Sequence, residues 1–502
     1  MSLTIESTKP GVTALVNEGS VARPFNRQPT STAFVVGFAN WGPIGVRKVI
    51  TSWPEYLRTF GGFHPLGWLA DFAYIFFNVF GGKQMVAVRA GGGDAATVQI
   101  PNRAGSPVAT FQFDAKYRSS SVDITVTVSD TDNTNNVDIK IVSSALGITE
   151  NYKDTNIRNA GDIAAINAAS KLVNVSLIHS IVVGATGRPA AGGFVLTGGT
   201  DDSDEIDPTD LTEYLAQFED ETLGTGQVLI PGFGSPTNYA GLIAHAEGYN
   251  RMALIGTDLA TSDTDAADAL TGTPSSFAAG YWPWVEMSAV DGSGGKKFYP
   301  PEIFAAGACA QVDRTIGTHK APANISVPGA IDVERAADGS SMINDGVREF
   351  LNGKNINAIA PIAGEGIKIY GARVLAPAGE TRIKFVHERR MLNLIYYTAK
   401  LGYAWAVFAV VDGAGRLFRD LKSAGSTFLR NLWRDGGLYG KTEAEAFVVT
   451  ADETNNPPDE LEQGRVHVQL GVKLSPTAEQ IFVNIDSVPL SQDLSVLNGG
   501  KN

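Results

Sequence analysis

An uninterrupted apolar run near the start of the chain sets the strongest limit on its fold. Residues 33–38 read AFVVGF, with no polar side chain to mark a solvent-exposed face. A strand without alternation is typical of the centre of a sheet that is covered on both faces. Further strand and helix patterns take turns after it, at 46–50, 55–60, 68–80, 85–89, 227–230, 238–248 and 252–255. The sequence therefore predicts an α/β core.

A stretch of different character interrupts this core over residues 93–200. Glycine clusters bound it, at 91–93, 192–193 and 198–199. Apolar and polar residues alternate at 122–128 and 137–141, which is the period of half-buried strands, and one helical pattern covers 160–171. We interpret this stretch as a β-rich domain inserted into the core. The acidic run that follows it, at 201–207, is predicted to be a solvated linker rather than a cation site.

Length and composition bound the remaining choices. A chain of 502 residues is expected to form about two to four domains. Its formal charge of −13 argues against a nucleic-acid coat, because a polyphosphate would be repelled. The single cysteine, Cys309, excludes an intramolecular disulfide and reads as a small core residue. The apolar runs are too short to cross a bilayer and no signal peptide is visible, so we expect a soluble protein assembled in a reducing cytoplasm.

The C-terminal part is predicted to be an α+β domain. A helix starting at 386 leads to an apolar strand at 405–411, and a second helix covers 415–434. Four apolar residues share one face of the second helix: Leu417, Leu421, Phe428 and Leu432. Gly436 and Gly437 end that helix, because glycine adopts left-handed geometry at little cost. Short strands are predicted at 447–449, 466–470 and 481–485.

Strand-like patterns also occur at both ends of the chain. Val12, Ala14 and Val16 alternate with other residues in an otherwise polar, turn-rich segment, and Ile481, Val483 and Ile485 do so shortly before the polar tail. A lone strand is not stable in water. The N-terminal segment is therefore either a disordered terminus or an arm that adds a strand to another subunit's sheet. The C-terminal strand can pair within its own subunit or in a neighbour.

The helix at 415–434 carries four cations outside its apolar stripe: Arg416, Arg419, Lys422 and Arg430. Such residues should be largely exposed. They form either an ordinary solvated face or a contact with an acidic partner surface.

Catalytic and metal-binding patterns are not found. The glycine-rich run at 292–297 lacks the first glycine and the hydroxyl residue of a phosphate-binding loop, and is predicted to be an exposed turn. The histidines show no metal-ligand spacing and are predicted to be isolated surface or packed residues: His64, His179, His245, His319, His387 and His467. We expect no catalytic residue, metal or cofactor.

Several segments, in order, resemble one known family. Residues 433–440 read WRDGGLYG, and an EAF strand, a DETNNP segment and an ELEQGR segment follow. Earlier segments include SWPEY at 52–56, FGGF at 60–63, KAPAN at 320–324 and GIKIYGARVL at 366–375. Together they resemble the contractile tail sheath family of bacteriophages and related contractile injection systems. The resemblance covers residues 31–92, parts of 228–375 and nearly all of 386–485.

The resemblance implies a fold in which a subtilisin-like α/β core is split by an outer insertion and flanked by extended arms. The corresponding limits are an N-terminal arm at 1–30, a core at 31–92 and 201–375, an insertion at 93–200, a C-terminal domain at 376–485 and a tail at 486–502. Fold similarity does not transfer chemistry, and no serine-hydrolase nucleophile or histidine segment is present.

The resemblance further implies a structural subunit that polymerises helically around an inner tube and contracts to drive that tube through a cell envelope. Its expected partners are other copies, the tube protein, and baseplate and tail terminator proteins, with no direct nucleic-acid contact and no membrane insertion. Its place would be a virion tail or injection particle. The alternatives are an α/β hydrolase and a non-contractile shell protein.

Overall fold

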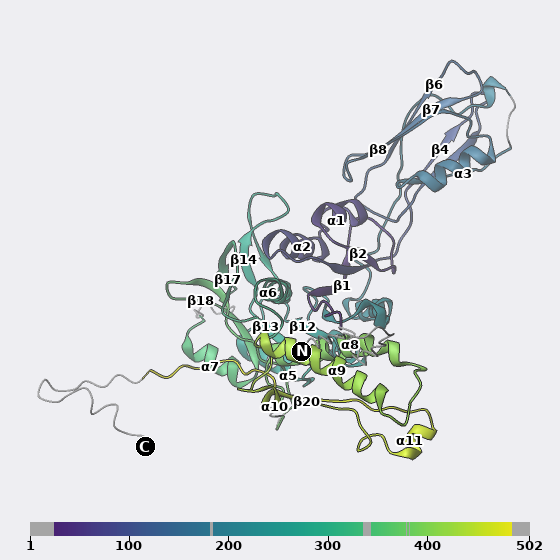
Figure 1. Cartoon of the computed structure of the whole chain (residues 1–502). Coiled ribbons are helices and arrows are strands. Elements are labelled where there is room, and N and C mark those ends of the chain that lie inside the picture. Colours follow the sequence, from purple (N-terminus) through teal and green to yellow (C-terminus); the bar gives the residue numbers. More distant parts are fainter. Residues whose placement is uncertain (1–24, 181–183, 335–342, 378, 381, 484–502) are drawn as a thin grey trace, which may run out of the picture.

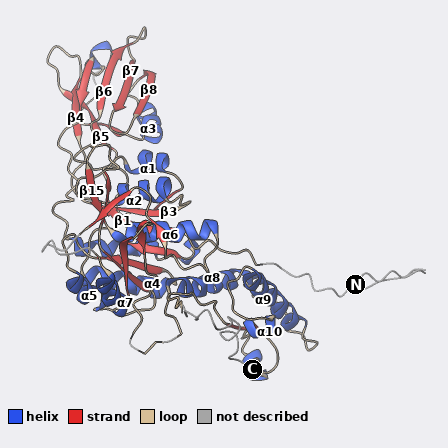
Figure 2. Ribbon diagram, turned by 90° about the vertical axis from the view of Figure 1, so that its left-hand side faces the viewer, coloured by secondary structure: helices blue, strands red, loops and turns tan. Residues whose placement is uncertain are grey.

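The computed structural model describes residues 25–180, 184–334, 343–377, 379–380 and 382–483. Figure 1 shows a central sheet-and-helix region, a β-rich extension rising from it, and a C-terminal helical region on the other side. The side view in Figure 2 places these three regions along one elongated axis. The architecture is mixed α/β with several separate sheets.

A mixed sheet forms the centre of the described chain. Its strand order is β16-β19-β18-β13-β12-β11-β1-β3-β2, and neighbours from β18 to β3 run parallel. The pairs β3–β2, β18–β19 and β19–β16 are antiparallel, and β2 and β16 form the two edges. The apolar run lies in β1, which is buried along its whole length between β3 and β11. The strands are β1 (Thr32–Phe38), β2 (Lys48–Ile50), β3 (Met85–Ala90), β11 (Gly226–Leu229), β12 (Met252–Gly256), β13 (Ala278–Trp282), β16 (Ile325–Ser326), β18 (Ile356–Ile362) and β19 (Gly366–Ile369).

Helices cover both faces of this sheet, as a fully apolar strand requires. Phe34 points to the face that holds Phe218, whereas Gly37 points to the opposite face, against Leu69. One face carries α2 (Leu69–Tyr74), the π-helical turn η1 (Ile75–Val79) and α6 (Pro301–Thr315), with α1 (Trp53–Phe60) beside α2. The other carries η3 (Pro208–Phe218), α4 (Pro236–Tyr249), α5 (Asp263–Thr271) and α7 (Asp345–Gly353). The helix predicted over 68–80 is thus α2 continued by η1.

The extension contains two sheets of its own. The order of the first is β4-β5-β9 and that of the second is β10-β6-β7-β8. Their apolar side chains form a separate cluster that includes Ile100, Phe113 and Ile139. The elements are β4 (Thr97–Pro101), β5 (Ala109–Ala115), β6 (Thr125–Asp130), β7 (Val137–Ser143), β8 (Ile148–Thr155), α3 (Ala160–Ala169), β9 (Val173–Leu177) and β10 (Gly192–Val195). The alternating runs at 122–128 and 137–141 correspond to β6 and β7.

The glycine-rich run at 292–297 spans the turn of a hairpin and the start of its second strand. It connects β14 (Val285–Ser288) to β15 (Lys296–Tyr299), and β14 also pairs with β17 (Ala330–Val333). Lys297 points back to the core, where its Nζ lies 2.9 Å from the buried Asp71 Oδ1. A strand rather than a helix follows the turn, so the run is no phosphate-binding loop.

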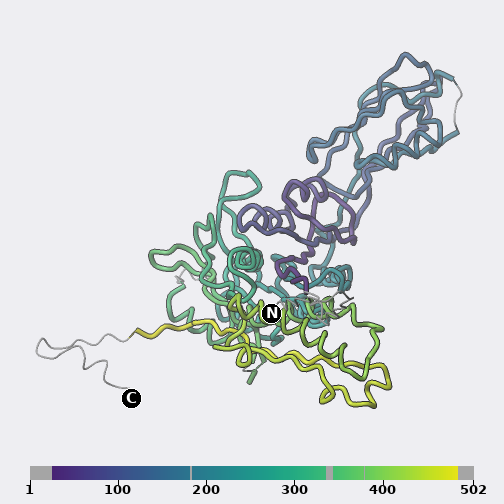
Figure 3. The backbone as a smooth tube through the Cα atoms, viewed as in Figure 1, coloured from purple at the N-terminus to yellow at the C-terminus, as the bar shows by residue number. Residues whose placement is uncertain are grey.

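The C-terminal region is built on two helices, α8 (Val386–Gly402) and α9 (Arg416–Arg434). The apolar stripe of α9 is buried, and Gly436 takes the predicted left-handed conformation (φ +85°) after its end. Figure 3 shows the last described part of the chain, in yellow, running back below these helices, which are green. The remaining elements are η5 (Ala404–Ala406), α10 (Glu443–Ala446), β20 (Phe447–Thr450), α11 (Pro458–Glu462) and β21 (Gln469–Val472).

The strand predicted at 405–411 is wrong. That run forms the 3-10 turn η5 and then a loop in which Val407, Phe408 and Val410 are exposed. Trp405 packs toward Leu417 and Leu421 on α9. An apolar run shows that a segment avoids water, but it does not show whether a partner strand is within reach. Within the described chain none pairs with it.

A buried carboxyl joins α6 to the end of β11. Glu302 Oε1 accepts a hydrogen bond from the Gly232 N–H at 2.7 Å, and the side chain is 2% exposed. Burial raises the pKa of Glu302 to about 7, although the Gly232 hydrogen bond opposes the shift. Because the folded-state pKa lies above the usual value, ionisation disfavours the native state.

This shift predicts how stability depends on pH. The contribution of Glu302 to the free energy of unfolding is fully present at acidic pH, where the side chain is protonated, and it is lost as pH rises through about 7. Glu302→Gln keeps an acceptor for Gly232 but cannot ionise. Relative to the wild type, the variant should gain roughly 2 to 3 kcal/mol between about pH 5 and about pH 8 in urea unfolding. The control is Glu213→Gln on the exposed surface of η3; equal pH profiles for Glu302→Gln and wild type would contradict the assignment.

Candidate assembly interface

The first described residues of the chain are bound to the C-terminal helices. The Phe25 ring packs edge-on against Tyr403, with centroids 4.8 Å apart, and also contacts Phe428 of α9. The Gln28 N–H donates to Thr398 Oγ1 of α8 at 3.3 Å. The first described part of the N-terminal segment is therefore fixed to α8 and α9, and we call these contacts its root.

A buried polar cluster fixes this root to the core as well. Arg390 of α8 donates to the Thr30 carbonyl at 3.3 Å and also pairs with Asp313 of α6. The Thr30 hydroxyl donates to Asp313 at 2.6 Å, and Gln227 Nε2 donates to the Thr30 carbonyl at 2.8 Å. Arg390 and Thr30 are buried. One cluster thus ties together α6, α8, β11 and the N-terminal segment.

The C-terminal segment is held by the first turn of the same helix, α8. His387 Nε2 lies 3.2 Å from the Ser475 carbonyl oxygen. Further on, Arg373 holds the Glu479 carboxylate through two hydrogen bonds of 2.7 Å each, with Lys384 at 3.7 Å. Burial opposes ionisation of Glu479, but Arg373 outweighs it and lowers the pKa of the carboxyl. Two parallel N–H···O bonds make this a geometrically specific clamp.

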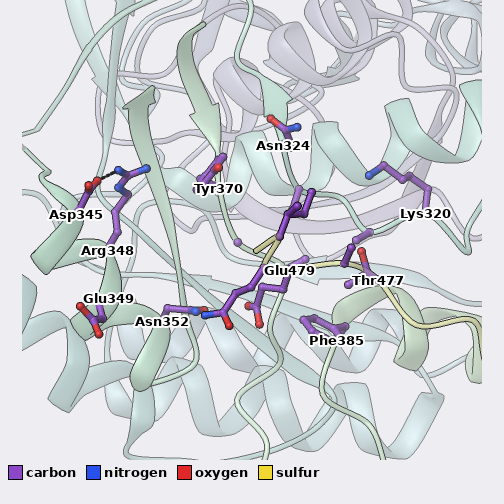
Figure 4. Close-up of a pocket in the computed structure, with 17 residues that line it drawn as sticks. Lys320, Asn324, Asp345, Arg348, Glu349, Asn352, Tyr370, Phe385, Thr477 and Glu479 are labelled. Atoms are coloured by element: carbon purple, nitrogen blue, oxygen red, sulfur yellow. Dashed lines mark hydrogen bonds and ion pairs between the residues drawn. The ribbon is translucent and has the colours of Figure 1, made fainter. Parts of the chain in front are cut away.

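Figure 4 shows Glu479, the acidic partner of this clamp, beside a groove in the surface. Thr477 and Glu479 lie along one wall of a groove of about 740 Å³, opposite Tyr370 and the α7 residues Asp345 and Arg348. The C-terminal segment therefore runs across the surface of the core as far as Glu479.

The chain becomes exposed directly after the clamp. Ile481, Phe482 and Val483 are 81%, 85% and 75% exposed and belong to no strand. Two of the residues predicted to form terminal strands, Ile481 and Val483, are thus exposed to solvent. The other predicted strand residues lie outside the described residues: Val12, Ala14, Val16 and Ile485. Pairing of either end with a neighbouring copy remains a prediction.

The C-terminal region contains a two-stranded ribbon with free edges. β20 and β21 pair antiparallel, from Phe447 opposite Val472 to Thr450 opposite Gln469. The predicted strand at 447–449 is found as β20, whereas that at 466–470 begins only at Gln469. Within the described residues each strand has one ladder neighbour. Unpaired N–H and C=O groups on an edge form a template for a further strand.

Three of the four predicted cations project from α9 into solvent. Arg416, Arg419 and Lys422 are exposed, opposite the buried apolar stripe. Arg430 differs, because it is half-buried and its Nε lies 2.6 Å from Glu443 Oε1. The basic face is therefore formed by the first half of the helix. The apolar loop at 407–411, where Phe408 is fully exposed, precedes this helix in the chain.

A buried His–Asp–Ser group is the strongest catalytic candidate in the described chain, and its geometry argues against catalysis. His64 Nε2 lies 3.3 Å from Ser203 Oγ and 3.5 Å from Asp201 Oδ2. The Leu66 N–H donates to His64 Nδ1, so the proton of the neutral ring is on Nε2. A general base needs a free lone pair facing the hydroxyl, and this nitrogen has none.

This group corrects one prediction. His64 is a packed histidine, which is one of the two predicted environments, but the start of the acidic run is not solvated, since Asp201 and Ser203 are buried. Ser203 and His64 are 139 positions apart, so no local spacing could have revealed the contact. The same holds for the clamp between Arg373 and Glu479, 106 positions apart.

In the described part of the chain, no group of three or more His, Cys, Asp or Glu side chains is arranged to hold a metal ion. Among the same residues, no helix has the length and apolar character needed to span a bilayer.

Among the known proteins compared with this chain, only solved structures are similar to it. No protein-family model matches the sequence, and no curated relative does. A contractile sheath complex of the PVC extracellular contractile injection system, in its contracted state, matches with a TM-score of 0.58 at 18% identity, covering 98% of this chain and 100% of that one. The helical sheath of the anti-feeding prophage, also contracted, gives 0.56 at 18% identity, covering 96% and 100%.

A sheath tail protein from Listeria innocua matches with a TM-score of 0.59 at 14% identity, covering 87% of this chain and 91% of that one. At such identities the likeness concerns the fold. The resemblance seen in the sequence is confirmed at that level: this chain has the fold of the sheath proteins of contractile tails and contractile injection systems.

Proposed function

We propose that this protein is a contractile sheath subunit, which polymerises helically around an inner tube and drives that tube through a target envelope. The observation that carries the proposal is the fold shared with a contractile sheath over 98% of the chain. Its partners would be other copies of itself, the tube protein, and baseplate and tail terminator proteins. It would be assembled in the bacterial cytoplasm and function in a virion tail or an injection particle.

The arrangement of the two ends supports assembly through exchanged strands. Both terminal segments are held at α8, and the C-terminal one then presents apolar residues to solvent. An extended segment with exposed apolar side chains, in a protein that also has a ribbon with free edges, favours addition of that segment to a neighbour's sheet. In this proposal residues 12–16 and 481–485 are the strands that pass to adjacent C-terminal domains.

The movement of the sheath follows from the same arrangement. Backbone ladders would hold neighbours together, while the polar linkers outside the roots would bend. Each subunit would then move as a rigid body. The energy of contraction would come from subunit contacts that are more extensive or better matched in the contracted lattice.

In this proposal the protein is not an enzyme, and its chain is divided as the sequence predicts. The core at 31–92 and 201–375 keeps a subtilisin-like arrangement without its chemistry. The other parts are the arm at 1–30, the outer insertion at 93–200, the C-terminal domain at 376–485 and the tail at 486–502.

Removal of residues 1–20 should abolish polymerisation without unfolding the subunit. The described root begins at Phe25, so the truncated chain keeps its contacts with Tyr403 and Thr398. Sedimentation should give monomers whose melting temperature equals that of the full chain, and negative-stain microscopy should show no cylinders. Normal sheaths from the truncated chain would refute the role of the arm.

Polar substitution in the C-terminal strand should have the same effect. Ile481→Asn together with Val483→Asn removes apolar side chains that contribute little to the monomer, because both are exposed. Monomer stability should change by less than about 0.5 kcal/mol, while assembly is lost. The matched control is Ile178→Asn with Val195→Asn, two exposed apolar residues of the β-rich extension. If the control blocks assembly and the test variant does not, the strand assignment fails.

Charge reversal on α9 tests the contact with the tube or an adjacent subunit. Arg419→Glu with Lys422→Glu should weaken assembly around tubes, and the defect should depend on salt because exposed charges are screened. Lys140→Glu with Lys153→Glu makes the same change in net charge on exposed residues of the β-rich extension. Assembly that is unchanged in the first variant at low salt would exclude the contact.

A further inference from the structure

Three segments that are distant in sequence meet at the base of the β-rich extension. His64 lies in the loop after α1 in the core. Ser120 lies between β5 and β6 in the extension. Asp201 and Ser203 lie on the segment that returns from the extension to the core. The buried His–Asp–Ser group is therefore a junction between two parts of the molecule.

Asp201 is the centre of this junction. Its Oδ1 accepts a hydrogen bond from Ser203 Oγ at 2.8 Å, and its Oδ2 accepts one from Ser120 Oγ, also at 2.8 Å. The Ser120 and Ser203 N–H groups donate to the same carboxylate at 3.4 Å. Burial opposes its ionisation, but these donors outweigh burial and lower the pKa of Asp201 to about 2. The carboxylate is thus a charged acceptor shared by the extension and the returning segment.

Core residues complete the charge balance around Asp201. The His64 ring, oriented by the Leu66 N–H, directs its Nε2 proton toward Asp201 and Ser203. The buried guanidinium of Arg89 in β3 donates to the Gly42 carbonyl at 2.9 Å, and the negative charge of Asp201 opposes the lowering of its pKa by burial. Loss of Asp201 would leave a buried cation without its compensating charge.

Apolar contacts lie beside the polar group. The core residue Trp41 packs edge-on against Tyr117 of the extension, with centroids 5.3 Å apart, and belongs to the extension's own apolar cluster. The β7–β8 turn contributes Leu146, which lies against Gly61 and Trp41. The junction therefore resists rotation at several separated points rather than at the two chain crossings alone.

We propose that this junction locks the extension to the core, so that the two move as one rigid lever. Asp201, with Ser120, Ser203 and His64, is the lock, and the contact between Trp41 and Tyr117 is its apolar support. When the core rotates, the outer end of the extension then rotates by the same angle. The proposal deepens the rigid-body movement of the proposed function by naming the contacts that would make one subunit rigid. Its test is made on the single subunit, so its outcome does not depend on whether the protein forms a sheath.

The test measures the distance between the two parts in solution. Thr134→Cys, in the turn between β6 and β7, and Glu213→Cys, on η3, are exposed positions for spin labels. The only native cysteine, Cys309, is buried, so labelling is selective. Double electron–electron resonance on the full chain should give one narrow distance distribution. A broad distribution in the otherwise unchanged chain would overturn the proposal.

Substitutions then identify the lock. Asp201→Asn should replace the narrow distribution with a broad one, while the exposed Asp204→Asn should preserve it. Should Asp201→Asn fail to fold, Ser120→Ala with Tyr117→Leu provides the test, because it removes one polar and one aromatic contact and leaves the core charges intact. Circular dichroism confirms folding of each variant. A narrow distribution in a folded lock variant would show that the junction does not hold the extension.

Discussion

The structure depends on one buried cation in α8. The Arg390 guanidinium is almost completely enclosed and is compensated by Asp313 of the core helix α6 and by the Thr30 carbonyl. A buried charge that loses its partner costs several kcal/mol, so this pairing is strongly maintained once formed. It connects the core, the C-terminal helices and the start of the chain in a single contact.

The consequence is that both ends of the chain are held by the same helix. His387 binds the C-terminal segment and Arg390 the N-terminal one, and residues three apart lie on neighbouring positions of a helix surface. A force on either terminal segment is therefore transmitted to α8 and from there to the central sheet. The junction at the base of the extension adds a second stiff connection. The described chain from Phe25 to Glu479 is therefore tied together through α8, the central sheet and the Asp201 junction.

Local patterns predicted the regular elements well. The unbroken apolar run of β1, the alternation in β6 and β7 and the apolar stripe of α9 each depend on a few successive residues, and each corresponds to an element of the structure. The prediction of a strand at 405–411 is wrong because a strand also needs a neighbouring strand to pair with, and the sequence pattern does not show whether one is within reach. The arm roots and the Asp201 junction were invisible for a related reason. Their hydrogen bonds include one between Ser120 and Asp201, 81 positions apart, and one between Gln28 and Thr398, 370 positions apart, and nothing in the flanking sequence marks either partner.

The central claim is that the two ends of the chain connect copies of this protein to one another. A cryo-electron microscopy reconstruction of the polymerised protein tests it most directly, since the path of each terminus can be traced. The account predicts that residues 481–485 lie as a strand against the β20–β21 ribbon of an adjacent copy, with residues 12–16 also paired between copies. Termini that fold back onto their own subunit in the polymer would contradict it.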